Sequence, residues 1–219
     1  MNRLVVFDCD GTLVDSQATI CAAIEQGFGA CGIAAPGADA ARGIIGLSLI
    51  EAMQRLHPAG TRDEHDALTI AYKNAFFEMR AAGLASEPLY EGIADVIATL
   101  DARGWMLGVA TGKSDRGLRH ILDHHGLHAR FVTLQTADRH PSKPHPAMLE
   151  QAMTEAGATP GTTVMIGDTS YDIAMAKAAG AAAIGVAWGY HDVAVLREAG
   201  ADAVAHHASE LVPMIEALR

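Results

Sequence analysis

The sequence is poor in basic residues and has no basic block. It has 16 Lys and Arg residues and 26 Asp and Glu residues, which gives a formal net charge of −10. Because an extended nucleic-acid surface needs clustered Lys and Arg side chains, we expect no nucleic-acid partner. A small anionic substrate stays possible, since a metal ion and one or two cations inside a pocket are enough to hold it.

Cysteines and long uncharged runs are scarce as well. Cys9, Cys21 and Cys31 match no zinc-binding spacing, so reduced thiols of a cytosolic protein are the simpler interpretation. The apolar run 4–7 is too short for the core of a signal peptide. The longest uncharged run, 178–191, is too short to span a bilayer. We therefore expect a cytoplasmic protein that does not associate with membranes.

Two patterns divide the 219 residues, whose length suits one domain with a modest insertion. Between residues 16 and 86, apolar residues recur at helical spacing and no strand is evident, with Asp15 or Ser16 as the expected N-cap of the first helix. From residue 91 onward helix, glycine and strand alternate, which predicts a parallel sheet. The expected strands are 4–7, 105–110, 131–134, 163–166, 182–186 and 203–204.

Two acids directly follow the first apolar run. Leu4 to Phe7 is short and does not alternate, as expected of a buried parallel strand. Ligands bind at the carboxyl ends of such strands, where Asp8 and Asp10 stand, and strand alternation points both acids the same way. Two ionised carboxylates this close repel, so a site keeps both only with a cation between them or a raised pKa on one.

The stretch Asp-x-Asp-Gly-Thr-Leu-Val-Asp-Ser, residues 8–16, resembles the first motif of the haloacid dehalogenase superfamily, in its phosphatase branch. The resemblance implies that Asp8 is the nucleophile that takes the phosphoryl group and that Asp10 is the general acid and base. Dehalogenases of the superfamily lack the second Asp, so Asp10 favours phosphoryl transfer over carbon–halogen cleavage.

A second motif, Thr111-Gly112-Lys113-Ser114, follows the expected strand 105–110. A hydroxyl and free N–H groups at such a place can hold a phosphate oxygen, although the same residues suit the N-cap of a following helix. The family has a Thr or Ser here that holds the transferring phosphoryl group, which implies this role for Thr111. Gly112 and Lys113 are the expected further substrate contacts.

The third motif is a lysine in a proline-rich loop, 141–146. Pro146 suits the first turn of a helix over 147–156. A loop lysine is usually solvated, but rigid flanks aim Lys143, and a compact ammonium offsets the charge of two carboxylates and a phosphate. The stretch matches the family's Lys-Pro motif, which implies a catalytic role for Lys143.

The last motif repeats the opening architecture, with an apolar strand followed by Gly167, Asp168 and, one helical turn later, Asp172. The residues alone also allow Asp168 to cap the following helix. The stretch resembles the family's Gly-Asp-Thr-x-x-Asp motif, in which the first Asp binds magnesium. The resemblance implies a Mg²⁺ site made by Asp8, the backbone carbonyl of Asp10 and Asp168, with Asp172 supporting it indirectly.

The four motifs imply a Mg²⁺-dependent phosphatase that works through an aspartyl-phosphate. The expected fold is α/β, a Rossmann-like parallel-sheet core (1–15 and 87–219) with an inserted all-helical cap domain (16–86). Rival functions are a sugar phosphomutase, a pyrophosphatase or a phosphonatase on the same scaffold, and a non-enzymatic binding module. Leu49 counts against the mutase, because resembling mutases carry a basic residue soon after their Gly-x-Ser turn.

The expected cap offers few cations for a nucleotide or a bisphosphate, which would need several of them or stacking aromatic rings. Arg42, beside Gly43 and Gly46, is the cap residue expected to meet a substrate carboxylate, with an ordinary loop cation as the alternative. Residues 185–190 also resemble phosphoglycolate-phosphatase-like members. We therefore expect a small phosphorylated metabolite such as phosphoglycolate as substrate, and a monomer or homodimer.

Overall fold

The computed structural model describes residues 2–218. Its six strands form one parallel sheet in the order β3-β2-β1-β4-β5-β6. The strands are β1 (Leu4–Phe7), β2 (Met106–Thr111), β3 (Thr133–Thr136), β4 (Thr163–Gly167), β5 (Ala182–Val186) and β6 (Ala203–Ala205). In the central register, Leu4 lies opposite Met106 on one side and Thr163 on the other, so β1 is flanked by β2 and β4.

Helices cover both faces of the sheet. On one face α5 (Ile93–Ala102), α6 (Asp115–His124) and α10 (Leu211–Ala217) pack against Val5 and Phe7 of β1. On the other face α7 (Ala147–Ala156), α8 (Ser170–Ala178) and α9 (Val193–Glu198) pack against Leu4 and Val6. Because successive side chains of β1 enter opposite cores, a strand in this position has to be apolar throughout. The predicted α/β fold class is confirmed.

Two predicted strands begin later than expected. The strand predicted over 105–110 runs over 106–111, because the N–H of Trp105 still bonds the Leu100 carbonyl at the end of α5. The strand predicted over 131–134 runs over 133–136, because the short 3₁₀ helix η1 (His128–Arg130) ends with the N–H of Phe131 bonded to His128. Two further 3₁₀ helices are η2 (Pro160–Thr162) and η3 (Ala208–Glu210).

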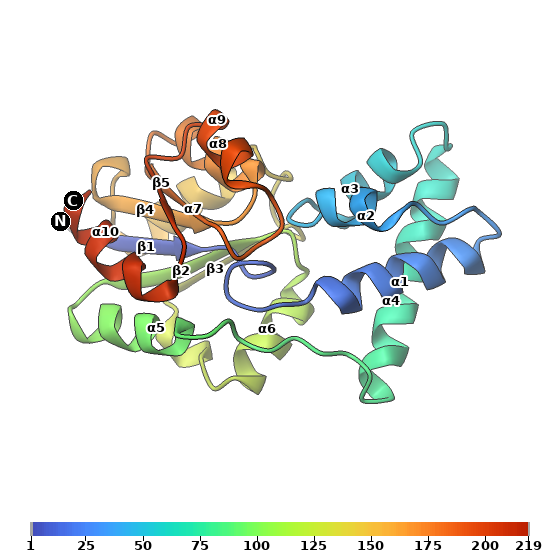
Figure 1. Ribbon diagram of the computed structural model, residues 1–219, viewed down its shortest axis with the longest axis horizontal. Helices are drawn as coiled ribbons and strands as arrows, with labels where there is room; N and C mark the ends of the chain where they lie inside the picture. Colours follow the sequence, from blue (N-terminus) through green and yellow to red (C-terminus); the bar gives the residue numbers. More distant parts are fainter. Residues whose placement is uncertain (1, 219) are drawn as a thin grey trace.

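Four helices follow the first strand and share a hydrophobic cluster that Tyr190 of the core also joins: α1 (Gln17–Ala30), α2 (Ala38–Gly43), α3 (Leu49–Leu56) and α4 (Arg62–Ala81). Helix α1 lies so close to α4 that a Cβ at Gly27 would come within 3.0 Å of the Tyr72 nitrogen. The helical unit lies beyond the carboxyl ends of the strands, on the right in Figure 1. In residues 2–218 no helix is both long and apolar enough to cross a membrane.

Candidate active site

Neighbouring strand ends bring the residues of the sequence motifs together. Asp8 follows β1, Thr111 ends β2 and Asp168 follows β4, and these three strands are adjacent in the sheet. The loop between β3 and α7 adds Lys143, whose Nζ lies 2.9 Å from Asp8 Oδ1. All four side chains are buried. Residues from four distant parts of the sequence therefore meet at the carboxyl end of the central strand.

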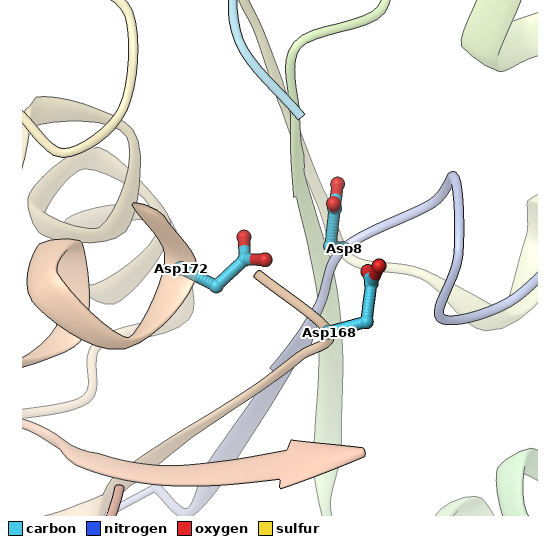
Figure 2. Close-up of side chains that lie close together, drawn as sticks. All are labelled: Asp8, Asp168 and Asp172. Carbon is cyan, nitrogen blue, oxygen red and sulfur yellow. The ribbon is translucent and has the colours of Figure 1, made fainter. Parts of the chain in front are cut away.

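Three carboxylates form the centre of this site. One oxygen from each of Asp8, Asp168 and Asp172 lies within 4.8 Å of the others, and Figure 2 shows the carboxylates gathered at the strand ends and the start of α8. Asp168 Oδ1 accepts a hydrogen bond from Thr12 Oγ1 (2.8 Å), and its Oδ2 accepts one from the N–H of Tyr190 (3.0 Å). These donors hold the Asp168 carboxylate in one orientation.

Lys143 sits between two of the acids. Its Nζ is 2.6 Å from Asp172 Oδ1 as well as 2.9 Å from Asp8 Oδ1. Burial lowers the pKa of Lys143, but the carboxylates of Asp172 and Asp8 outweigh it and raise that pKa above the ordinary value. When all are ionised, the three carboxylates and one ammonium carry a net formal charge of −2, so the buried cluster lacks positive charge.

Burial and the excess negative charge raise the pKa values of two of the acids. Burial, opposed by Lys143 and reinforced by Asp172, raises the pKa of Asp8 to about 7. Burial and the nearby carboxylates of Asp172 and Asp8 also raise the pKa of Asp168 well above its ordinary value. A cation placed between these carboxylates would favour their ionised forms.

The donor set fits a hard divalent cation. Asp8 Oδ1 accepts the N–H of Cys9 (2.7 Å) and contacts Lys143, whereas its Oδ2 is buried with no hydrogen-bond partner in the part of the chain that the structure describes. Buried polar atoms in proteins almost always have a partner, so a buried acceptor without one indicates a place where an ion or another ligand binds. A Cβ on Gly11, whose φ is +82°, would come within 2.2 Å of Asp168, so the backbone packs closely around the site. Carboxylate oxygens are the ligands that Mg²⁺ and Ca²⁺ prefer.

Asp172 differs from the other two acids because both of its oxygens have donors. Oδ1 contacts Lys143, and Oδ2 accepts hydrogen bonds from the N–H and the hydroxyl of Thr169, at 3.0 and 2.7 Å. Thr169 is the N-cap of α8 and forms a capping box with Asp172. The alternative in which Asp168 caps this helix is therefore wrong, since Thr169 does so.

Asp10 has a separate set of partners. Its Oδ1 contacts the Ser16 hydroxyl and lies 2.7 Å from Lys113 Nζ, and that ammonium is also 3.2 Å from Glu87 Oε1. Glu87 in turn pairs with Arg80 at the end of α4, at 2.7 Å. Ser16 is the N-cap residue of α1, as expected, but its side chain makes no capping hydrogen bond, and the Asp15 carboxylate accepts the N–H of Gln17 (3.3 Å) instead.

Sequence reasoning missed Glu87 and Arg80, and it could not foresee the partners of Ser16. A single Glu before a proline gives no pattern to recognise. The Ser16 hydroxyl also lies 3.3 Å from the hydroxyl of Tyr190, which is 174 residues away in the sequence. Only the folded chain brings these groups to Asp10.

The second motif lies where β2 meets the helical unit. Thr111 is buried, and its Oγ1 accepts the N–H of Lys113 (3.2 Å). Ser114, not Thr111, caps α6 by accepting the N–H of Gly117. A Cβ on Gly112 would come within 2.3 Å of the Leu47 carbonyl oxygen. The backbone of the loop before α3 therefore packs directly against Gly112.

Arg42 lies apart from the other predicted site residues. It stands in α2, its side chain is 46% exposed, and it pairs with Asp39 at 3.2 Å. A cavity of about 700 Å³ opens between the helical unit and the core, lined by Asp10, Gly112 and Lys113, but Arg42 is absent from the described residues that line it. This geometry favours the alternative of an ordinary surface cation.

Comparisons with known proteins agree with this geometry. Residues 5–186 match the family model described as haloacid dehalogenase-like hydrolase. The "Probable phosphatase IndB" of Dickeya dadantii is 36% identical over 100% of this chain and 95% of its own length. Phosphoglycolate phosphatase 1 of Pseudomonas aeruginosa is 32% identical over 96% of this chain and 79% of its own length. A crystal structure of a predicted phosphatase from Clostridium acetobutylicum superposes with a TM-score of 0.88, at 24% identity and 99% coverage of both chains.

The family match covers most of the chain and includes every motif around Asp8. The two curated relatives align over nearly all of it. This chain therefore belongs to the haloacid dehalogenase-like hydrolases and is a phosphatase of that family.

Proposed function

We propose that this phosphatase is Mg²⁺-dependent and hydrolyses a small phosphomonoester through an aspartyl-phosphate on Asp8. The observation that supports it most is the state of the Asp8 carboxylate. One of its oxygens is held by the Cys9 N–H and Lys143, while the other is buried and has no donor among residues 2–218. A carboxylate held in this way has one oxygen oriented and the other available to a cation or a phosphorus atom.

The proposed reaction has two steps. An oxygen of Asp8 attacks phosphorus, the bond from phosphorus to the leaving oxygen breaks, and Asp10 gives that oxygen its proton. Asp10 then takes a proton from a water molecule that attacks the aspartyl-phosphate and releases inorganic phosphate. Thr111 and Lys143 stand at adjacent strand and loop ends, where they would bind the oxygens of the transferring group.

A divalent cation would be held by Asp8, Asp168 and the backbone carbonyl of Asp10. When bound, it supplies positive charge that stabilises the phosphoryl oxygens in the transition state. Asp172 would act on the site through Lys143, whose ammonium it fixes at 2.6 Å.

We also propose that residues 16–86 form a cap domain on a catalytic core made of 1–15 and 87–219. Contacts across the boundary support a closed arrangement. The N–H of Ser48 donates to Ser142 Oγ (2.8 Å), and the Tyr171 hydroxyl donates to the Gly43 carbonyl (3.0 Å). Such a cap would exclude bulk water from the site and select the substrate.

Phosphoglycolate, the substrate expected from the sequence, is also the substrate in the names of relatives such as the Pseudomonas aeruginosa enzyme. The cavity between the helical unit and the core favours a larger alcohol within the same class of small phosphomonoesters. Gly112 and Lys113 stay the proposed substrate contacts of the core, because both line the cavity beside Asp10. A monomer or homodimer in the cytoplasm remains the proposal for the assembly and its location.

Asp8→Asn tests the covalent mechanism. The amide is a far poorer nucleophile than the carboxylate but has the same shape, so the variant should fold and lose at least about 10³-fold in kcat with benzyl phosphate and Mg²⁺. Circular dichroism and thermal unfolding check the fold. Wild-type turnover by a folded Asp8→Asn protein would rule out the aspartyl-phosphate.

A further inference from the structure

The cavity between the helical unit and the core is where the leaving group of the substrate would lie. Among the described site carboxylates, Asp10 lines this cavity while Asp8, Asp168 and Asp172 do not. In the proposed function, on which this inference rests, Asp10 protonates the leaving oxygen. The organic part of the substrate, attached to that oxygen, therefore extends from Asp10 into the cavity.

The cavity wall on the helical unit is predominantly apolar. It includes Ile24 of α1, Ile44 of the connection between α2 and α3, Leu49 and Met53 of α3, and the rings of Tyr72 and Phe76 on α4. The two rings lie in contact, with centroids 5.8 Å apart. Apolar walls with a few polar groups at one end are typical of sites that bind the carbon skeleton of a ligand and orient it by its polar end.

The cations nearest Asp10 are already neutralised. Lys113 contacts Asp10 and Glu87, and Arg80 contacts Glu87, all within 3.2 Å. Both cations also pack against the ring of Phe76, with Arg80 at 4.7 Å and Lys113 at 5.6 Å from its centroid. A carboxylate two carbons away from the leaving oxygen would have to compete with Asp10 and Glu87 for these two cations. Two further cations, Lys73 of α4 and Arg116 of α6, also line the cavity, and Arg116 packs over the ring of Phe77 at 5.2 Å.

The volume of about 700 Å³ also exceeds what a two-carbon acid fills. A water molecule takes about 30 Å³ of liquid volume, so a glycolate unit would leave most of this cavity to water against apolar walls. A ring removes that water and buries apolar surface, which is favourable in proportion to the area.

We infer that the cavity selects phosphomonoesters whose alcohol carries an apolar, ring-sized group, and that phosphoglycolate is a poorer substrate for this enzyme. Benzyl phosphate and ethyl phosphate test this directly, because both release a primary alcohol and differ in the ring. With Mg²⁺, kcat/KM for benzyl phosphate should exceed that for ethyl phosphate and for phosphoglycolate by at least about tenfold.

Two variants test whether the preference for benzyl phosphate arises from the cavity wall. Ile44→Asn puts an amide into the cavity wall and should bring the ratio of benzyl to ethyl phosphate kcat/KM close to one. Ile70→Asn is the matched control, because Ile70 is 60% exposed on α4 and is absent from the described lining residues. It should keep the wild-type ratio. An unchanged ratio in folded Ile44→Asn, or an equal loss in both variants, would contradict the assignment of the cavity.

Calorimetry separates this inference from the proposed function. Benzylphosphonate, which has no ester bond to hydrolyse, should bind at least about tenfold more tightly than ethylphosphonate, with a more negative heat-capacity change from the buried ring. Equal affinities, or a preference for phosphoglycolate in turnover, would overturn the inference while leaving phosphatase activity intact. Selective binding of benzylphosphonate without hydrolysis of any ester would support the cavity assignment and refute the proposed function.

Discussion

Three aspartates of one site differ because each meets different donors. Asp172 has donors on both oxygens, and Asp168 is held by Thr12 and Tyr190. Asp8 keeps one buried oxygen that has no donor in the described part of the chain. A residue whose oxygens are occupied by donors orients its neighbours, while an acceptor without a donor is suited to bind the cation itself. Sequence spacing alone does not separate these roles.

Asp168→Asn and Asp172→Asn, compared in one Mg²⁺ titration of activity, test this division. Asp168→Asn removes a charge from the proposed cation site and should raise the half-saturating Mg²⁺ concentration by more than about 100-fold. Asp172→Asn acts through Lys143 and should raise it by about 10–100-fold. An unchanged half-saturation in Asp168→Asn would end its assignment as a metal ligand.

Substitution of Lys113 tests whether this residue holds Asp10 in position or binds the substrate. Its ammonium joins Asp10 to Glu87, and all three side chains are at most 10% exposed. Lys113→Met leaves two buried carboxylates without this partner, which should cost about 3–5 kcal/mol of unfolding free energy and lower kcat. The double variant Lys113→Met/Glu87→Gln, measured by chemical denaturation, should recover part of the stability without the activity. A rise in KM alone would instead identify Lys113 as a substrate contact.

At the scale of elements, one loop of the helical unit touches the core at the strand ends. The backbone of Leu47 rests on Gly112, directly after β2, and the N–H of Ser48 bonds the Ser142 side chain beside Lys143. The same loop therefore contacts two of the core segments that carry motifs. Packing of the helical unit and geometry of the site are coupled at this place.

Gly112→Ala tests that coupling. The added Cβ would lie 2.3 Å from the Leu47 carbonyl oxygen, so the loop has to move away. Misplacing the cap in this way should lower kcat/KM by about tenfold or more while the core stays folded. Gly29→Ala in α1 is the control, because its Cβ meets nothing within 4 Å and alanine favours the helix. Equal kcat/KM in both variants would show that closure does not depend on this contact.

At the scale of the whole molecule, the chain builds three hydrophobic clusters, one on each face of the sheet and one in the helical unit. The buried acids lie between them, at the sheet edge that faces the helical unit. Their charge excess makes the stability of the fold depend on pH and on cations. The raised pKa of Asp8 contributes stability below its ordinary value of 3.8, and that contribution is lost as the pH rises through about 7.

Mg²⁺ should therefore stabilise the protein more at pH 8 than at pH 6. At pH 6 most Asp8 carboxyls hold a proton that the cation has to displace, which weakens its apparent affinity about tenfold. At Mg²⁺ concentrations well above both dissociation constants, this difference is about 1.4 kcal/mol, or roughly 3–5 °C in Tm, by thermal scanning. Asp168→Asn serves as the control and should lose the Mg²⁺-dependent shift at both pH values. Equal shifts of the wild type at pH 6 and pH 8 would contradict the coupling.

Sequence alone determined the sheet and its motifs, because these depend on neighbours in the chain. A run of four apolar residues followed by Asp8 specifies a buried strand with an acid at its end, and Asp168 follows β4 in the same way. Parallel pairing then places such strand ends side by side. The fold class and the family followed from this local information.

Only the tertiary structure decided what surrounds each acid. Lys113 reaches Asp10 across 103 positions of the sequence, and Tyr190 reaches Ser16 across 174. It also placed Arg42 away from the cavity and lined that cavity with the apolar faces of α1, α3 and α4. The physical reason is that hydrogen bonds, burial and cavity shape depend on which distant segments pack together, and no spacing within the sequence records those distances.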